Sequence, residues 1–136
     1  MNTPWVCRKC RRRFKRRNQR HACGTGERAD LLRNRPPGIV ALYEALEDFA
    51  RGLGPVEIVT RDRYALLRGA RIFADAVVMT DALRLAIHLP RRVEHALFIK
   101  VGADRRHVTH VAKLRRKEDL DSLKPLLREA YLHSLG

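Results

Sequence analysis

Every cysteine of the chain lies within the first 23 residues, and this cluster constrains the fold of that segment more than any other feature. Cys7 and Cys10 form a C-x2-C pair, and His21 and Cys23 follow as an H-x-C pair. Thiolates and imidazoles are the side chains that hold a structural zinc ion, and such an ion takes four ligands in a tetrahedral arrangement. The spacing therefore predicts one zinc ion bound by these four residues, with no position left open for a water molecule.

Two aromatic residues accompany the first pair of cysteines. Trp5 stands two residues before Cys7, and Phe14 stands four residues after Cys10. A zinc finger of the Cys2His2 type places aromatic residues in this way to cover its metal, because so short a segment builds little core otherwise. The loop before His21 is shorter than in such a finger and leaves too few residues for a full recognition helix. We therefore predict a zinc knuckle over residues 1–24.

A disulfide is the alternative use of these cysteines. It would leave one of the three unpaired, and nothing before Cys7 has the pattern of a secretory signal. We therefore expect a reducing, cytoplasmic location. No uncharged apolar run approaches the length needed to cross a bilayer, so no membrane association is expected.

Positive charge is concentrated at the same end of the chain. Residues 1–35 contain 12 Lys and Arg against 2 Asp and Glu, whereas residues 36–136 contain 17 against 13. A metal-ordered loop with many cations suits phosphate backbones, and counterion release alone would give it affinity for nucleic acid. An acidic protein and a merely solvated basic surface remain as alternatives. The predicted nucleic-acid contacts are the seven basic residues between Cys10 and His21: Arg11, Arg12, Arg13, Lys15, Arg16, Arg17 and Arg20.

The rest of the chain divides into a linker and one domain. Residues 25–37 follow Gly24, contain Gly26 and two prolines and show little apolar periodicity, which indicates a linker. Leu31 and Leu32 are expected to dock on the next domain. Residues 38–136 are enough for one domain with a single core. Its first helix is predicted to begin at Pro36 or Pro37 and to end at Gly52. A last helix is predicted with Ser122 as its N-cap and Pro125 in its first turn.

Between these helices the apolar residues alternate with a period of two, which is typical of strands. Thr80-Asp81 links two of the strands as a hairpin, and Gly102–Asp104 closes another. The expected fold class is α+β, an antiparallel sheet of about five strands packed with two helices. The predicted strands are Val56–Thr60, Ile72–Val78, Leu83–Leu89, Leu97–Val101 and His107–Leu114.

Residues for catalysis are sparse in this domain. It contains no glycine-rich phosphate loop, no G-x-S-x-G motif and no cysteine, so we expect no enzymatic activity. The odd spacing of His107 and His110 sends them to opposite faces of a strand, where they cannot share one metal ion. No recognisable spacing pairs His88, His95 or His133 with a carboxylate. Five further residues could line an anion-binding surface, although exposed strand and loop positions are the simpler interpretation. They are Tyr64, Arg68, Arg71, Arg91 and Arg92.

Four stretches of the chain together resemble one bacterial family. They are TPWVCRKCRRRFKRRNQRHAC, RPPGIVALYEAL, GPVEIVTRDRYALLRGARIFADAVV and RHVTHVAKLRRKEDLDSLKPLLREAY. The chain resembles, over nearly its whole length, the family known as domain of unknown function 5655. This resemblance implies a knuckle fused ahead of a small α+β domain and supports the four metal ligands, but it implies no activity.

Three functions are compatible with these observations. The expected one is a zinc-stabilised protein that binds nucleic acid. The alternatives are a protein-interaction or regulatory adaptor and a small-ligand binder that uses the sheet.

Overall fold

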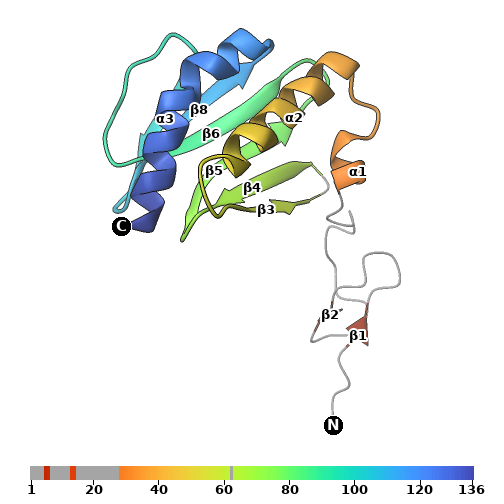
Figure 1. Cartoon of the computed structure of the whole chain (residues 1–136), viewed down its shortest axis with the longest axis horizontal. Coiled ribbons are helices and arrows are strands. Elements are labelled where there is room, and N and C mark those ends of the chain that lie inside the picture. The colour runs from red at the N-terminus through yellow and green to blue at the C-terminus, as the bar shows by residue number, and fades with distance from the viewer. Residues whose placement is uncertain (1–4, 7–12, 15–27, 62) are drawn as a thin grey trace.

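The computed structural model describes residues 5–6, 13–14, 28–61 and 63–136, and it has an α+β fold (Figure 1). Two short strands near the N-terminus pair with each other, and a six-stranded antiparallel sheet with helices forms the rest. In chain order the elements are β1 Trp5–Val6, β2 Arg13–Phe14, α1 Arg28–Leu32, α2 Pro37–Arg51, β3 Glu57–Thr60, β4 Tyr64–Arg68, β5 Ile72–Val78, β6 Leu83–Leu89, β7 Phe98–Ala103, β8 Val108–Leu114 and α3 Lys117–Leu135.

The strand order in the large sheet is β3-β4-β5-β6-β8-β7, and each strand runs antiparallel to its neighbours. Both predicted hairpins are confirmed: β5 pairs with β6 and β7 pairs with β8. The first of these turns closes with a hydrogen bond from Met79 N to Ala82 O of 3.0 Å. Because β6 lies beside β8, the chain passes from β6 along residues 90–97 to the edge strand β7.

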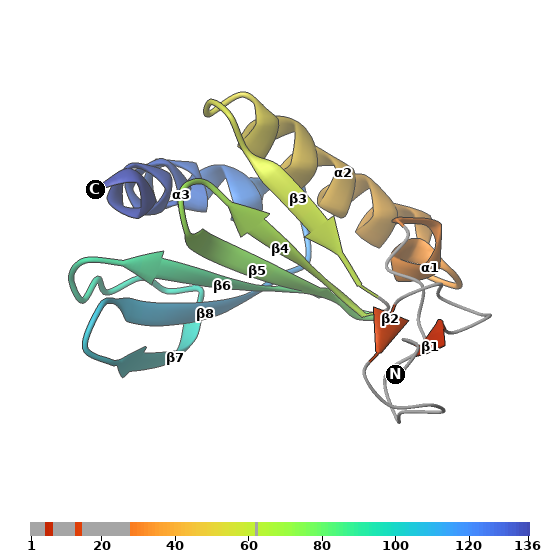
Figure 2. The ribbon, with the colours of Figure 1, turned by 90° about the horizontal axis from the view of Figure 1, so that it is seen from below.

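The two long helices cover one face of this sheet, and no helix of the described residues lies on the other (Figure 2). Alternate side chains of the central strands point toward the helices. In β6 these are Leu83, Leu85, Ile87 and Leu89, all with 0% exposure. Leu42 and Leu46 of α2 and Leu123 and Leu127 of α3 belong to the same buried cluster. Burying a leucine side chain contributes roughly 1.5–3 kcal/mol, so this covered face supplies most of the fold's stability.

Helix α2 follows the predicted pattern. Pro37 stands at its first position, where a proline needs no backbone donor, and the helix ends at Arg51 before Gly52. Its buried residues recur at three- and four-residue steps along one side, as the apolar periodicity predicts. They include Ile39, Leu42, Tyr43 and Leu46.

Part of the predicted linker belongs to the packed domain. Residues Arg28–Leu32 form helix α1, and Leu31 is fully buried in the core. Arg28 fixes this helix to α2, since its Nε donates to Glu47 at 2.9 Å and its Nη2 to Glu44 at 3.2 Å. Five residues are too few for an apolar periodicity to stand out in a sequence, and the two neighbouring prolines dominate the pattern. The boundary predicted at residue 24 lies outside the described residues.

The predicted start of the last helix is wrong. Helix α3 begins at Lys117, five residues before Ser122, and Pro125 lies inside it. The carboxylate of Asp119 explains the earlier start, because its Oδ2 accepts hydrogen bonds from the backbone nitrogens of Arg115 and Arg116 at 2.9 and 3.2 Å. A carboxylate in the first turn also interacts favourably with the helix dipole.

Strand β4 was not among the predicted strands, so the sheet has six strands in place of about five. In the sequence YALLR the outward position between Tyr64 and Arg68 holds Leu66, so three apolar residues, Ala65 to Leu67, stand in a row. Ala65 and Leu67 are buried under the helices, whereas Leu66 is only half-buried on the opposite face. Because Leu66 is apolar although it points outward, the sequence of β4 does not alternate between apolar and polar residues.

Candidate functional site

The four predicted metal ligands, Cys7, Cys10, His21 and Cys23, lie outside the described residues. So do six of the seven basic residues predicted to bind nucleic acid; the seventh, Arg13, lies in β2. Strand β2 pairs with β1 in antiparallel register, with Trp5 opposite Phe14 and Val6 opposite Arg13. The residues that connect the two strands, 7–12, include the C-x2-C pair.

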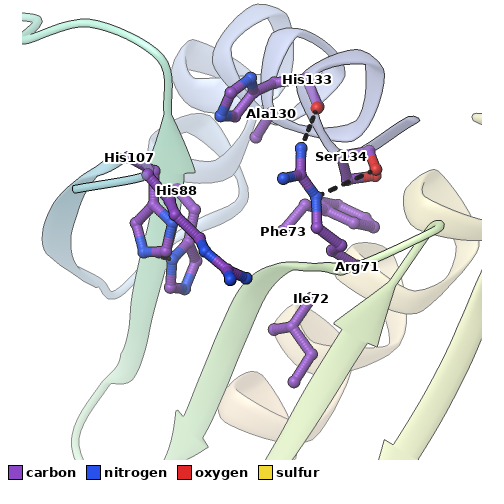
Figure 3. Close-up of a pocket in the computed structure, with 9 residues that line it drawn as sticks. Arg71, Ile72, Phe73, His88, His107, Ala130, His133 and Ser134 are labelled. Atoms are coloured by element: carbon purple, nitrogen blue, oxygen red, sulfur yellow. Dashed lines mark hydrogen bonds between the residues drawn. The ribbon is translucent and has the colours of Figure 1, made fainter. Parts of the chain in front are cut away.

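A pocket of about 200 Å³ opens at one end of the large sheet (Figure 3). It lies where β5 begins, β6 ends and β8 begins, beside the last turns of α3. The basic residues that line it are Arg71, His88, Arg106, His107 and His133. None of these five residues was predicted as a functional residue, although Arg71 was considered for an anion-binding surface.

Arg71 holds the end of α3. Its Nη2 donates to the carbonyl oxygen of His133 at 2.7 Å and its Nε to that of Ser134 at 3.4 Å, as the dashed lines in Figure 3 show. A guanidinium at this position pairs with carbonyls that the last helical turn leaves without a donor. Gly69 allows the close approach, since a side chain there would collide with Ser134 and Tyr131. The role of Arg71 is therefore structural.

His88 and His107 form the centre of the pocket. Nδ1 of His88 lies 2.6 Å from Nε2 of His107, and the two rings meet edge to face with their centroids 4.2 Å apart. One nitrogen must carry the hydrogen and the other must accept it, so the pair shares a single proton across this contact. Burial lowers the pKa of His107, and the neighbouring His88 lowers it further. Both effects favour the neutral form of His107.

Two carboxylates approach the histidine pair from either side. Asp104 Oδ1 accepts hydrogen bonds from the backbone nitrogens of Arg106 and His107 at 2.7 and 3.0 Å, and these bonds lower the pKa of Asp104. Its Oδ2 lies 3.3 Å from Nε2 of His107. On the other side Asp75 Oδ2 lies 3.8 Å from Nε2 of His88, a buried nitrogen without a hydrogen-bond partner among the described residues. The pocket thus brings together two imidazoles and two carboxylates, each within 3.8 Å of its neighbour.

The same geometry does not fit a metal ion. Two nitrogens about 2.0–2.1 Å from one tetrahedral zinc lie roughly 3.3 Å apart, so the 2.6 Å contact is a hydrogen bond. Within the described ranges no three His, Cys, Asp or Glu side chains are arranged to hold a metal.

His110 is separated from His107, as the odd spacing predicts. It is fully buried, its Nε2 accepts from the backbone nitrogen of Val93 at 2.9 Å, and its Nδ1 donates to the carbonyl of Val108 at 3.0 Å. It thereby holds the crossing segment 90–97 against the sheet. Burial lowers the pKa of His110.

The residues considered for an anion-binding surface do not form one surface. Arg91 forms a bidentate ion pair with Glu129 of α3 at 2.8 and 3.1 Å, and Arg71 caps α3. Tyr64 and Arg68 lie on strand β4. Sequence reasoning also missed the contact of His88 with His107, because only the pairing of β6 with β8 brings these residues together across 19 positions.

The chain belongs to the family named Domain of unknown function (DUF5655), whose family model matches residues 29–134. The match begins inside α1 and ends near the end of α3, so it covers the large sheet and its helices. No curated protein and no solved structure matches the chain. Among the described residues no helix is both long and apolar enough to cross a membrane.

Proposed function

We propose that this is a bacterial, cytoplasmic zinc protein that binds nucleic acid through the phosphate backbone with little sequence preference. The observation that carries the proposal is the placement of seven cations between the two halves of a zinc ligand set. Zinc bound by Cys7, Cys10, His21 and Cys23 would order a segment too short to fold by itself. The protein then acts by binding and not by catalysis.

The pairing of β1 with β2 supports the metal site. A hairpin whose connecting residues include a C-x2-C pair is the arrangement in which small zinc domains present two thiolates to one ion.

Zinc content tests the metal site. The full chain, purified under reducing conditions without chelator, is expected to contain one equivalent of zinc. Cys7→Ala and Cys23→Ala are each expected to lose it while the domain of residues 28–136 keeps its thermal transition, because that domain has its own core. Well under one equivalent in the unmodified protein would refute the site.

A salt titration tests the nucleic-acid function. If about four phosphates are engaged, the logarithm of the affinity for duplex DNA falls with the logarithm of salt with a slope of roughly −3.6. Replacing Arg12, Arg13, Arg16 and Arg17 together by Ala is expected to flatten this slope and to weaken all sequences about equally. A matched control replaces four exposed arginines of the domain: Arg51, Arg92, Arg115 and Arg128.

The alternative is an adaptor that binds a protein partner. It takes the place of the proposal if the unmodified chain binds neither DNA nor RNA at low ionic strength. The same conclusion follows if the quadruple loop variant binds as well as the control.

A further inference from the structure

The open face of the large sheet carries a row of four side chains, one from each of four adjacent strands. Tyr64 of β4 lies opposite Val77 of β5, Val77 lies opposite Arg84 of β6, and Arg84 lies opposite Lys113 of β8. Residues directly opposite each other in a sheet point to the same side. These four residues, called the cationic row below, therefore lie together on the face opposite α2 and α3, which no helix in the described part of the chain covers (Figure 2).

Arg84 and Lys113 face each other as like charges on neighbouring strands. Such a pair is destabilising, and neither side chain has a hydrogen bond or an ion pair with any described residue. Elsewhere on this face a cation is matched by an acid, since Arg68 lies opposite Glu57. A like-charged pair that weakens the sheet indicates a function for that positive charge.

A shallow hollow of about 320 Å³ lies next to the row on the same face. Arg84 and Lys100 border it, and Thr109 and Val111 lie between them. Lys100, opposite Val111 on β7, has no partner among the described residues and adds a third cation. Asp104 also lines the hollow, at the end away from the cationic row.

The uncharged part of the face is apolar. Tyr64, at the β4 end of the row, is 40% exposed. Three half-buried residues, Val59, Leu66 and Val77, continue the surface across β3, β4 and β5. The face therefore combines an exposed aromatic residue, a largely apolar floor and cations that no described acid pairs, and three interstrand spacings, about 14 Å, separate Tyr64 from Lys113. One carboxylate, Asp75, lies on the same face, opposite Leu66 and Ala86.

We propose that this open face binds single-stranded nucleic acid. Arg84, Lys113 and Lys100 contact phosphates, and a base stacks on Tyr64, the combination by which sheet surfaces hold single strands. The proposal rests on the nucleic-acid function proposed above and adds a second surface to it. Duplex is disfavoured here, because a sheet of six strands is about 24 Å wide and the major groove about 12 Å. An acidic protein would complement the cations, but its binding would not explain why the aromatic residue Tyr64 is exposed beside them.

Fluorescence anisotropy with the full chain tests this. The probes are labelled oligothymidylate and oligouridylate of about 12 nucleotides and a duplex of the same length. The double variant Arg84→Gln/Lys113→Gln is expected to flatten the salt slope for the single strands by about 1.4, or about 0.7 for each lost phosphate contact. Its matched control is Arg51→Gln/Arg128→Gln, which removes the same charge from exposed positions on the helices and is expected to keep the slope.

Tyr64 provides a test that net charge does not affect. Tyr64→Ala is expected to weaken single-strand binding about fivefold or more, whereas Tyr64→Phe retains the ring and is expected to bind as the unmodified chain does. Thermal unfolding of each variant confirms that the domain is folded before binding is measured.

The outcomes separate the two proposals. If the sheet variants bind single strands like the control while the quadruple loop variant loses affinity, the open face is not a binding surface and the loop function stands. If the unmodified chain binds no nucleic acid at all, both proposals fail. Equal weakening of duplex and single-strand binding by Arg84→Gln/Lys113→Gln would also overturn the single-strand specificity.

Discussion

The two faces of the large sheet differ in what holds their side chains. On the covered face Ala65, Leu67, Leu85 and Ile87 are fully buried under α2 and α3. On the open face Leu66 and Val77 are half-buried, and Arg84 is exposed opposite Lys113. On the covered face, close packing favours the apolar side chains that are present. On the open face, packing does not explain why Arg84 lies opposite Lys113. The surface that we propose for binding therefore lies on the face that contributes less to stability.

The largest effect is expected from a pair of neighbouring leucines on β4. Leu67→Ala removes a fully buried side chain and is expected to lower the free energy of unfolding by about 2–5 kcal/mol. Leu66→Ala, one residue earlier on the open face, is expected to lower it by only about 1 kcal/mol, because its side chain is already partly in water. Denaturant unfolding measures both. Equal losses would mean that the open face is also covered in the native protein.

Two glycines give a smaller contrast. A methyl group on Gly69 would collide with Ser134 and Tyr131 of α3, so Gly69→Ala is expected to cost about 1–3 kcal/mol. A methyl group on Gly102, which lines the open-face hollow, meets no atom within 4 Å. Gly102→Ala is therefore expected to be neutral or stabilising by about 0.5 kcal/mol. If Gly102→Ala destabilises the protein as much as Gly69→Ala does, the hollow is not open.

His107, at the end of the sheet, is expected to make stability depend on pH. Because the folded-state pKa of His107 is lowered from 6.5, the unfolded chain binds a proton at a higher pH than the folded chain does. Stability is therefore complete above about pH 6.5 and declines as the pH falls below it. His107→Gln is expected to reduce the fall in melting temperature between about pH 7 and pH 5.

His110, whose pKa is lowered in the same direction, is present in both proteins, so part of the pH dependence is expected to remain in the variant. Asp104 acts below this range, because its pKa is lowered from 3.8. A steeper fall in melting temperature for His107→Gln than for the unmodified chain would contradict the assignment.

The smallest effect is expected at Arg84. Replacing it by Gln removes the like-charge contact with Lys113 and is expected to raise the free energy of unfolding by a few tenths of a kcal/mol at low salt. The gain is expected to shrink as salt increases, since screening weakens the same repulsion. A loss of stability would show that Arg84 is needed for the fold.

Much of the fold was predictable from local pattern. The apolar stripe and the flanking glycine and prolines gave α2 its bounds, and the alternation in Ile72–Val78 and Leu83–Leu89 gave the β5–β6 hairpin. Three errors share a physical cause. Helix α1 is too short to show a period, β4 has apolar residues on both faces, and Asp119 begins α3 before the expected serine.

The site was less predictable. A zinc ligand set is recognisable in a sequence because the metal requires particular donors at short spacing, and Cys7, Cys10, His21 and Cys23 remain predicted ligands. The contact of His88 with His107 and the row from Tyr64 to Lys113 have no local pattern. Each depends on which strands are neighbours and in which register they pair.

The sequence by itself determined the concentration of charge at one end, the candidate metal ligands and the α+β class, because composition, donor spacing and hydrophobic period are local properties. Only the tertiary structure decided that β6 pairs with β8, that both long helices cover the same face, and that Arg84 meets Lys113 on the other. These arrangements depend on contacts between residues far apart in the chain. Their stability comes from how whole elements pack against one another, which no local pattern records.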